Sequence, residues 1–172
     1  LMSSLFTEGE VALANHGLSA LAAQDVTPAD VVVGGLGLGY TAYAALCFPG
    51  VGSVVIVDAL APVIEWHQKG LVPLGEKLTS DSRCRFVHGN FFAMASSSGT
   101  GFDPESPERL FDAVLLDIDH SPDNLLDRGN AVFYTPAGLQ RLATFIRPNG
   151  VFALWSNDPP TDQFLGDLAA AF

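Results

Sequence analysis

Three glycines spaced two residues apart are the residues of this chain best suited to bind a ligand. Gly35, Gly37 and Gly39 follow the apolar, β-branched run 31–33, which is typical of a buried parallel strand. Glycine permits a tight turn and lets a ligand come close to the backbone. Helix-forming alanines follow in 40–48, so the turn would lead into a helix N-terminus with unpaired N–H groups. This segment predicts a ligand-binding turn between a strand and a helix.

A carboxylate at the end of the next predicted strand completes the pattern. Residues 54–57 are again apolar, and Asp58 follows them nineteen residues after Gly39. A carboxylate in that place can accept hydrogen bonds from both hydroxyls of a ribose. Strand, glycine turn, helix, strand and acid together predict a nucleoside site. The structural alternatives are tight strand–helix packing at the glycines and helix capping by Asp58.

The glycines alone do not identify the nucleoside. Residues 37–42 also match the dinucleotide pattern G-x-G-x-x-A, so an NAD-dependent dehydrogenase is an alternative. That hypothesis gives no role to Asp117, a carboxylate at the end of a buried apolar strand where it is costly without a purpose. It also gives no role to the segment 133–139, so we rank it last.

Composition excludes several classes of partner. The net charge is −11, from 19 acidic and 8 basic residues, so unassisted binding to nucleic acid is not expected, whereas a cationic substrate is favoured. No apolar run reaches the roughly eighteen residues of a membrane span, and residues 1–10 lack a signal-peptide pattern. Cys47 and Cys84 form no disulfide framework and no zinc-type spacing. We therefore expect a cytoplasmic protein without a metal.

Predicted strands and helices alternate along the chain. The strands are expected at 31–34, 54–58, 85–88, 111–117 and 151–155. The helices are expected at 5–23, 40–48, 61–71 (with an extension to 78 left open), 90–95, 136–146 and 163–172. This alternation predicts an α/β fold with a doubly wound, mostly parallel Rossmann-like sheet.

We expect a single domain over 1–172, with a lead-in helix in 1–25 and a Ser-, Gly- and Pro-rich surface loop at 96–109. Residues 119–131 are expected to be irregular, and Arg147–Gly150 to form a turn. The chain begins with Leu1 and stops on a helix, which indicates a fragment that lacks its last strands.

Polar residues follow four successive predicted strands: the 35–39 turn, Asp58, Gly89–Asn90, and Asp117 with Asp119. The carboxyl ends of parallel strands meet at one edge of a sheet, where such folds bind ligands. In this order the motifs resemble the class I S-adenosylmethionine-dependent methyltransferase fold and, within it, the spermidine synthase group.

The resemblance covers about residues 5 to 160. Residues 35–41 resemble that group's GGGDGGT loop, and residues 88–90 its G-D-A element. Residues 111–117 resemble the Y-D-V-I-I-x-D strand, and residues 133–139 and 142–151 the L-Y-S-x-E-F-Y segment and the L-x-P-G-G-V turn.

The resemblance implies that S-adenosylmethionine, or its decarboxylated form, binds in a transferase. The implied cofactor-binding residues are Gly35, Leu36, Gly37, Leu38, Gly39, Asp58, Ala59, Gly89, Asn90 and Asp117. Asp117 would orient or deprotonate an acceptor amine with help from Asp119 or His120, and Tyr134 would lie in the substrate pocket. The alternatives are a helix cap for Asn90, a loop contact for Asp119 and His120, and simple packing for Tyr134. Trp155 either lines the acceptor pocket or belongs to a rigid turn.

This chain departs from the family pattern at several positions. Leu38 replaces the aspartate that meets the donor's amine in aminopropyltransferases, and an apolar side chain cannot make that contact. The D-x-x-D-P gate has the sequence Asp117-Ile118-Asp119-His120-Ser121-Pro122, and an N-terminal β-strand domain is missing. We therefore expect methyl transfer to a small, possibly amine, acceptor. Spermidine synthesis and a non-catalytic nucleoside-binding module are the alternatives, and a homodimer is permitted.

Overall fold

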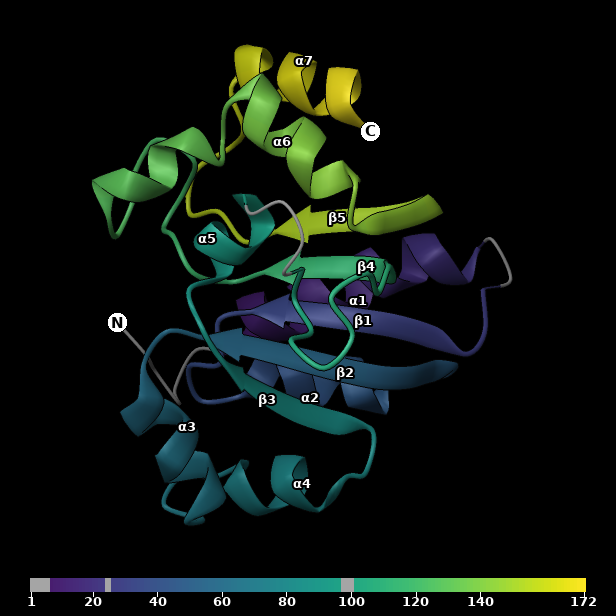
Figure 1. Ribbon diagram of the computed structural model, residues 1–172, viewed down its shortest axis with the longest axis vertical. Coiled ribbons are helices and arrows are strands. Elements are labelled where there is room, and N and C mark those ends of the chain that lie inside the picture. The colour runs from purple at the N-terminus through teal and green to yellow at the C-terminus, as the bar shows by residue number, and fades with distance from the viewer. Residues whose placement is uncertain (1–6, 24–25, 97–100) are drawn as a thin grey trace.

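The computed structural model describes residues 7–23, 26–96 and 101–172. Five strands form one sheet in the order β3-β2-β1-β4-β5, and every neighbouring pair is parallel (Figure 1). The strands are β1 (Ala29–Gly34), β2 (Val51–Asp58), β3 (Cys84–His88), β4 (Phe111–Leu116) and β5 (Ile146–Leu154). The predicted α/β fold with a parallel, doubly wound sheet is confirmed.

Helices cover both faces of this sheet because the strand residues alternate between two apolar cores. Val31 and Val33 belong to the core under α1 (Glu8–Ala22) and α2 (Tyr40–Cys47), which lie behind the sheet in Figure 1. Val32 belongs to the other core, which is rich in aromatic rings. That second face is covered by α5 (Phe91–Ser96), α6 (Pro136–Ala143) and α7 (Asp162–Ala171).

The strand order places a switch in direction between β1 and β4. The chain first builds outward from β1 through β2 to β3, and then returns to the other side of β1 to add β4 and β5. The loops after β1 and β4 therefore leave the sheet side by side in opposite directions, which opens a crevice at their carboxyl ends. The glycine turn follows β1 and Asp117 follows β4, so both meet at this crevice.

Several predicted boundaries differ from the observed elements. The helix predicted at 61–71 ends earlier, as α3 (Ala61–Gln68), and the chain then forms a separate helix, α4 (Gly75–Ser80). The segment predicted to be irregular contains a 3-10 helix, η1 (Arg128–Val132). The turn expected at 147–150 is an irregularity inside β5, where Asn149 has φ +66°. Parts of the expected lead-in helix and surface loop, 1–6, 24–25 and 97–100, lie outside the described residues.

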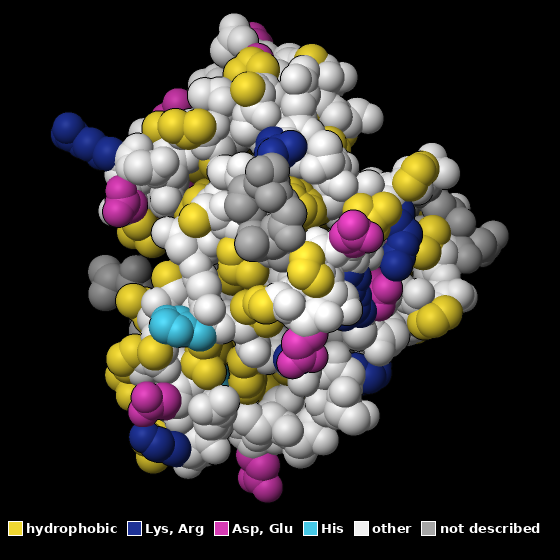
Figure 2. Space-filling model, viewed as in Figure 1, with side chains coloured by type: hydrophobic (Ala, Val, Ile, Leu, Met, Phe, Trp, Pro, Cys, Tyr) yellow, Lys and Arg dark blue, Asp and Glu magenta, His cyan; other side chains and the backbone are white. Residues whose placement is uncertain are grey.

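Ion pairs join the elements at the opposite edge of the sheet, where the strands begin. Arg109 and Arg147 both pair with Asp30, which precedes the centre of β1. Arg147 also pairs with the buried Asp112 of β4, and Arg109 with the buried Asp103. Figure 2 shows basic and acidic side chains interspersed on that side of the molecule. These contacts connect both halves of the sheet at the edge away from the crevice.

No helix in 7–23, 26–96 or 101–172 is long and apolar enough to cross a membrane. Within the same ranges, no three His, Cys, Asp or Glu side chains come together in a group that could hold a metal ion. Both cysteines are free, and burial raises the pKa of the Cys84 thiol to about 12.

Candidate active site

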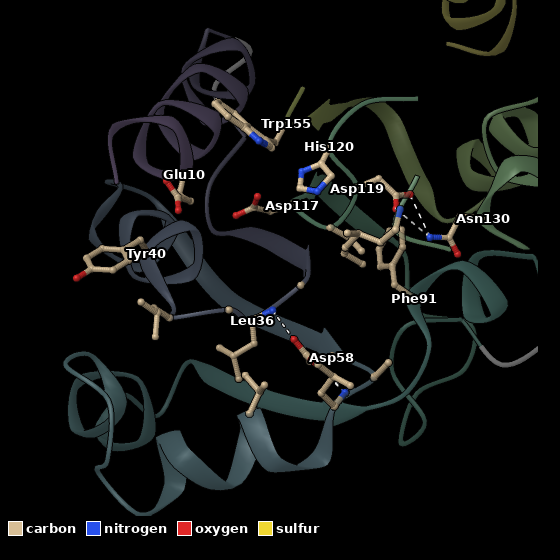
Figure 3. Close-up of a pocket in the computed structure, with 18 of the residues that line it drawn as sticks. Glu10, Leu36, Tyr40, Asp58, Phe91, Asp117, Asp119, His120, Asn130 and Trp155 are labelled. Atoms are coloured by element: carbon tan, nitrogen blue, oxygen red, sulfur yellow. Dashed lines mark hydrogen bonds between the residues drawn. The ribbon is translucent and has the colours of Figure 1, made fainter. Parts of the chain in front are cut away.

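A cavity of about 910 Å³ lies at the carboxyl ends of the strands. Its walls are the glycine turn, the residues that follow β2, β4 and β5, and the N-terminal turn of α1 (Figure 3). Of the predicted cofactor-binding residues, all but Gly89 line it, as do two of the predicted catalytic residues besides Asp117, namely Asp119 and His120. The prediction that polar residues meet at this edge of the sheet agrees with the geometry.

The glycine turn adopts a conformation that other residues rarely take. Gly35, Gly37 and Gly39 have φ values of +96°, +49° and +90°. A Cβ added at Gly35 would collide with the backbone carbonyl of Asp117, so glycine is required where the turn passes β4. Gly39 is the N-cap of α2, and its N–H donates to the carbonyl of Leu36 at 2.7 Å. The turn therefore presents its backbone directly to the cavity.

Asp58 holds the turn and faces the cavity at the same time. Its Oδ2 accepts a hydrogen bond from the backbone N–H of Leu36 at 2.8 Å, and its Oδ1 accepts one from Leu60 at 2.7 Å (Figure 3). Each carboxylate oxygen can accept more than one hydrogen bond, so capacity remains for two hydroxyl groups of a ligand. The cap geometry and the predicted ribose contact are therefore compatible.

His67 supports the turn from below, and the sequence analysis assigned it no role. This α3 side chain is fully buried, and its Nε2 donates to the backbone carbonyl of Gly37 at 3.1 Å. Burial lowers the pKa of His67, although the bond to Gly37 and the charge of Asp58 oppose the shift. A single histidine between Trp66 and Gln68 carries no sequence signal for this contact.

Asp117 lies beside the turn at the end of β4. Its Oδ2 accepts a hydrogen bond from the hydroxyl of Thr41 at 2.7 Å, and its N–H donates to the carbonyl of Gly34. Burial raises the pKa of Asp117, the bond from Thr41 opposes this, and the charge of Glu10 raises the pKa further. A carboxylate with a raised pKa in a cavity has the properties of a general base.

Asp119 and Tyr134 contact each other instead of facing the cavity together. The Tyr134 hydroxyl donates to Asp119 Oδ2 at 3.0 Å, and the Asn130 amide donates to both oxygens. The N–H of Leu126 donates to Oδ1 at 2.8 Å, and Asp119 is only 3% exposed. Tyr134 does not line the cavity. Its burial raises the pKa of its hydroxyl, and the neighbouring charge of Asp119 raises this pKa further. This geometry favours a supporting role, in which Asp119 fixes the 119–134 segment.

His120 does line the cavity, and it is half-buried. Its backbone is fixed by two bonds, from its N–H to the carbonyl of Asn124 and from the N–H of Asn157 to its carbonyl. In Figure 3 the imidazole lies on the same side of the cavity as Asp117 and Trp155. An imidazole in this position beside Asp117 can donate or accept a proton within the cavity.

The loop after β3 forms another part of the cavity wall. Asn90 lines the cavity, while its Oδ1 accepts a hydrogen bond from the N–H of Ala93 and so caps α5. Gly89 donates its N–H to the carbonyl of Asp58 at 2.9 Å and lies behind the lining. Phe91, which the sequence analysis did not single out, contributes an apolar ring to the wall.

The N-terminal turn of α1 contributes Glu8 and Glu10 to the lining, and neither was predicted. A Cβ at Gly9 would lie within 2.6 Å of the Trp155 ring, so this glycine lets α1 pack directly on the residue that follows β5. Trp155 itself lines the cavity, as one of the two sequence-based interpretations proposed.

Solved structures with this arrangement are known, although no protein-family model matches the chain. Spermidine synthase from Thermotoga maritima superimposes with a TM-score of 0.59 at 20% identity, covering 93% of this chain and 49% of its own. A spermidine synthase in complex with the transition-state analogue AdoDATO gives 0.65 at 21%, covering 95% and 49%. A Galdieria sulphuraria structure named for sarcosine dimethylglycine methyltransferase gives 0.51 at 17%, covering 82% and 45%.

The chain shares the fold of these spermidine synthase and methyltransferase structures. At these identities the likeness is one of fold, and the chain spans about half the length of the solved spermidine synthases that it matches. The fold expected from the sequence resemblance is thus confirmed.

Proposed function

We propose that this protein is a transferase that uses S-adenosylmethionine, or a close analogue, to transfer a methyl group to a small amine. The observation that carries the proposal is that Asp58, the glycine turn and Asp117 line one cavity, with Asp58 and Asp117 apart from each other along its wall (Figure 3). Asp58 and the turn suit the adenosine end of a donor, and Asp117 suits the group that reacts.

The donor-side residues fit a nucleoside. Gly35, Gly37 and Gly39 present backbone without side chains, and Asp58 retains acceptor capacity for ribose hydroxyls. Asn90 and Phe91 offer an amide and an aromatic ring beside the place of a base. When bound, a sulfonium donor supplies an activated alkyl group, so the protein mainly has to position the acceptor and exclude water.

Asp117 is the group suited to prepare an acceptor amine. Its Oδ2 is held by Thr41, and its Oδ1 receives no hydrogen bond from a described residue. An alkylammonium ion that transfers a proton to this oxygen becomes a neutral amine, whose lone pair is then available for the displacement. The raised pKa of Asp117 brings the two proton affinities closer together.

Aminopropyl transfer is the second candidate, and one observation favours it. Apart from His120 and Tyr40, the ionisable side chains that line the cavity are carboxyl groups, with no Lys or Arg among the lining residues that the structure describes. The carboxylate of an amino-acid tail has no Lys or Arg side chain to pair with here, whereas a decarboxylated donor needs none.

Calorimetric titration tests the proposal. We expect S-adenosylmethionine or its decarboxylated form to bind, and Asp58→Ala to weaken binding at least about tenfold, because a carboxylate bonded to hydroxyl groups contributes about 1.5–3 kcal/mol. Asp123→Ala removes an exposed carboxylate that does not line the cavity and is the matched control. Absence of binding by both donors, or equal binding by both variants, would overturn the proposal.

Turnover then distinguishes the candidates. Release of S-adenosylhomocysteine in the presence of amines supports methyl transfer, and release of methylthioadenosine from the decarboxylated donor supports aminopropyl transfer. Binding without turnover of either donor supports the non-catalytic alternative and contradicts the proposed transferase.

A further inference from the structure

The carboxyl groups in the cavity wall differ in how far they are already bonded. Asp58 accepts hydrogen bonds from two backbone N–H groups, and Asp119 is bonded to Asn130, Tyr134 and Leu126. Both oxygens of each of these carboxylates already accept a hydrogen bond from the protein.

Glu10 and Asp117 are different, because each has a carboxyl oxygen that accepts no hydrogen bond from a described residue. Asp117 is bonded only through Oδ2, and no described residue donates to the carboxyl group of Glu10. Figure 3 places the two carboxyl groups on the same side of the cavity, beneath Trp155. Glu10 is half-buried and close enough that its charge raises the pKa of Asp117.

The position of Glu10 is fixed by the way α1 packs. Gly9 lets this turn contact the Trp155 ring, and a Cβ at Gly17 would come within 2.8 Å of Leu115 in β4. Both glycines bring the helix backbone close to the second half of the sheet. The adjacent Glu10 is therefore held at the wall of the same cavity that Leu38 lines, and the apolar side chain of Leu38 supplies no charge there.

We propose that Glu10 is a specificity-determining residue that binds the primary ammonium group on the tail of the nucleoside donor, while Asp117 remains free for the acceptor. This inference rests on the proposed function and names the group that compensates for Leu38. The charge of Glu10 acts on Asp117, and a cation bound at Glu10 reduces the repulsion between the two carboxylates while gaining charge-assisted hydrogen bonds.

Two thioether nucleosides that differ only in the ammonium-bearing chain test this directly. Aminopropylthioadenosine carries the primary ammonium, and methylthioadenosine carries a methyl group in its place. We expect Glu10→Gln to weaken binding of aminopropylthioadenosine about tenfold and to leave the Kd of methylthioadenosine within about twofold. Glu76→Gln, which removes an exposed charge on α4 away from the cavity, should change neither constant.

The outcomes separate the two proposals. If methylthioadenosine binds and Glu10→Gln weakens both nucleosides equally, or neither, then Glu10 does not recognise the ammonium and only this inference fails. If neither nucleoside binds the unmodified protein, the nucleoside site itself is wrong and both proposals fail. A selective loss for aminopropylthioadenosine supports the inference for either transfer reaction, since both donors carry a primary ammonium.

Discussion

At the scale of single residues, the glycine turn owes its shape to neighbours that are distant in sequence. Asp58 fixes the N–H of Leu36, and His67 fixes the carbonyl of Gly37. The Gly37 carbonyl meets the buried His67 ring at 3.1 Å, and a carbonyl in such a place needs a donor. The histidine is thus a positioning residue for the proposed nucleoside site.

Replacing His67 by Phe retains a ring in the core and removes this donor. Leaving a buried carbonyl without a hydrogen-bond donor costs about 1–3 kcal/mol. We therefore expect the Kd of methylthioadenosine to rise about tenfold as the turn loosens. Calorimetry measures the change, and His16→Phe, on the exposed side of α1, is the control. An unchanged Kd would show that Asp58 alone holds the turn.

The same variant has a signature in the pH dependence of stability. The folded state holds the pKa of His67 below its usual 6.5, mainly through burial. The unfolded chain therefore binds this proton first, and the free energy of unfolding falls as pH drops below about 6.5. That contribution should disappear in the His67→Phe protein.

The sequence predicted the residues whose signal is local and missed those whose role depends on packing. The glycines, Asp58 and Asp117 stand at strand ends, and they meet as expected. Asp119 and Tyr134 are at the right edge but bond to each other, which no spacing rule reveals. The roles of Glu10 and His67 arise from how α1 and α3 pack, and one sequence does not specify helix orientation.

At the scale of elements, an ion-pair network stabilises the edge where the strands begin. The guanidinium of Arg147 donates to Asp112 Oδ2 at 2.6 Å and to Asp30 Oδ2 at 3.0 Å. Burial raises the pKa of Asp30, but hydrogen bonds from Ser53, Arg109 and Arg147 outweigh it, so the net pKa is lowered. The network thereby joins β1, β4 and the irregular start of β5.

Arg147→Met should destabilise the protein because it leaves the buried Asp112 carboxylate with a single donor, the N–H of Asp30. Breaking such a contact costs about 2–3 kcal/mol, which urea unfolding measures directly. Arg128→Met, an exposed residue for which no ion pair is observed among the described residues, should change stability by less than about 0.5 kcal/mol. Equal stability of both variants would mean that the network contributes specificity of pairing and no net free energy.

Boundaries of elements were predicted less well than their order. The apolar runs identified all five strands, since central parallel strands are apolar on both faces. The sequence predicts a turn at the irregular start of β5, because Asn149 and Gly150 are typical turn residues. Trp66 is 41% exposed, since the α3 face that packs inward carries Val63, Ile64 and His67.

At the scale of the whole molecule, the cavity spans the two halves of the sheet. Asp58 and the glycine turn belong to the half built by β1, β2 and β3, while Asp117, His120 and Trp155 belong to the half built by β4 and β5. A ligand that binds only the folded state raises the free energy of unfolding of every element that forms its site. A nucleoside that contacts both halves therefore stabilises both.

The chain contains two tryptophans, one in each half, which makes this linkage measurable. In the Trp155→Phe protein the tryptophan fluorescence comes only from Trp66 on α3, and in the Trp66→Phe protein it comes only from Trp155 after β5. With methylthioadenosine at 100 times the Kd of each variant, we expect both fluorescence transitions in urea to shift by the same amount, about 2.7 kcal/mol. A shift confined to the Trp66 signal would mean that the ligand contacts only the first half and that the halves unfold separately. In that case the ligand would make no stabilising contact with the half that carries Asp117, so the coincidence of the two transitions bears directly on the proposed chemistry.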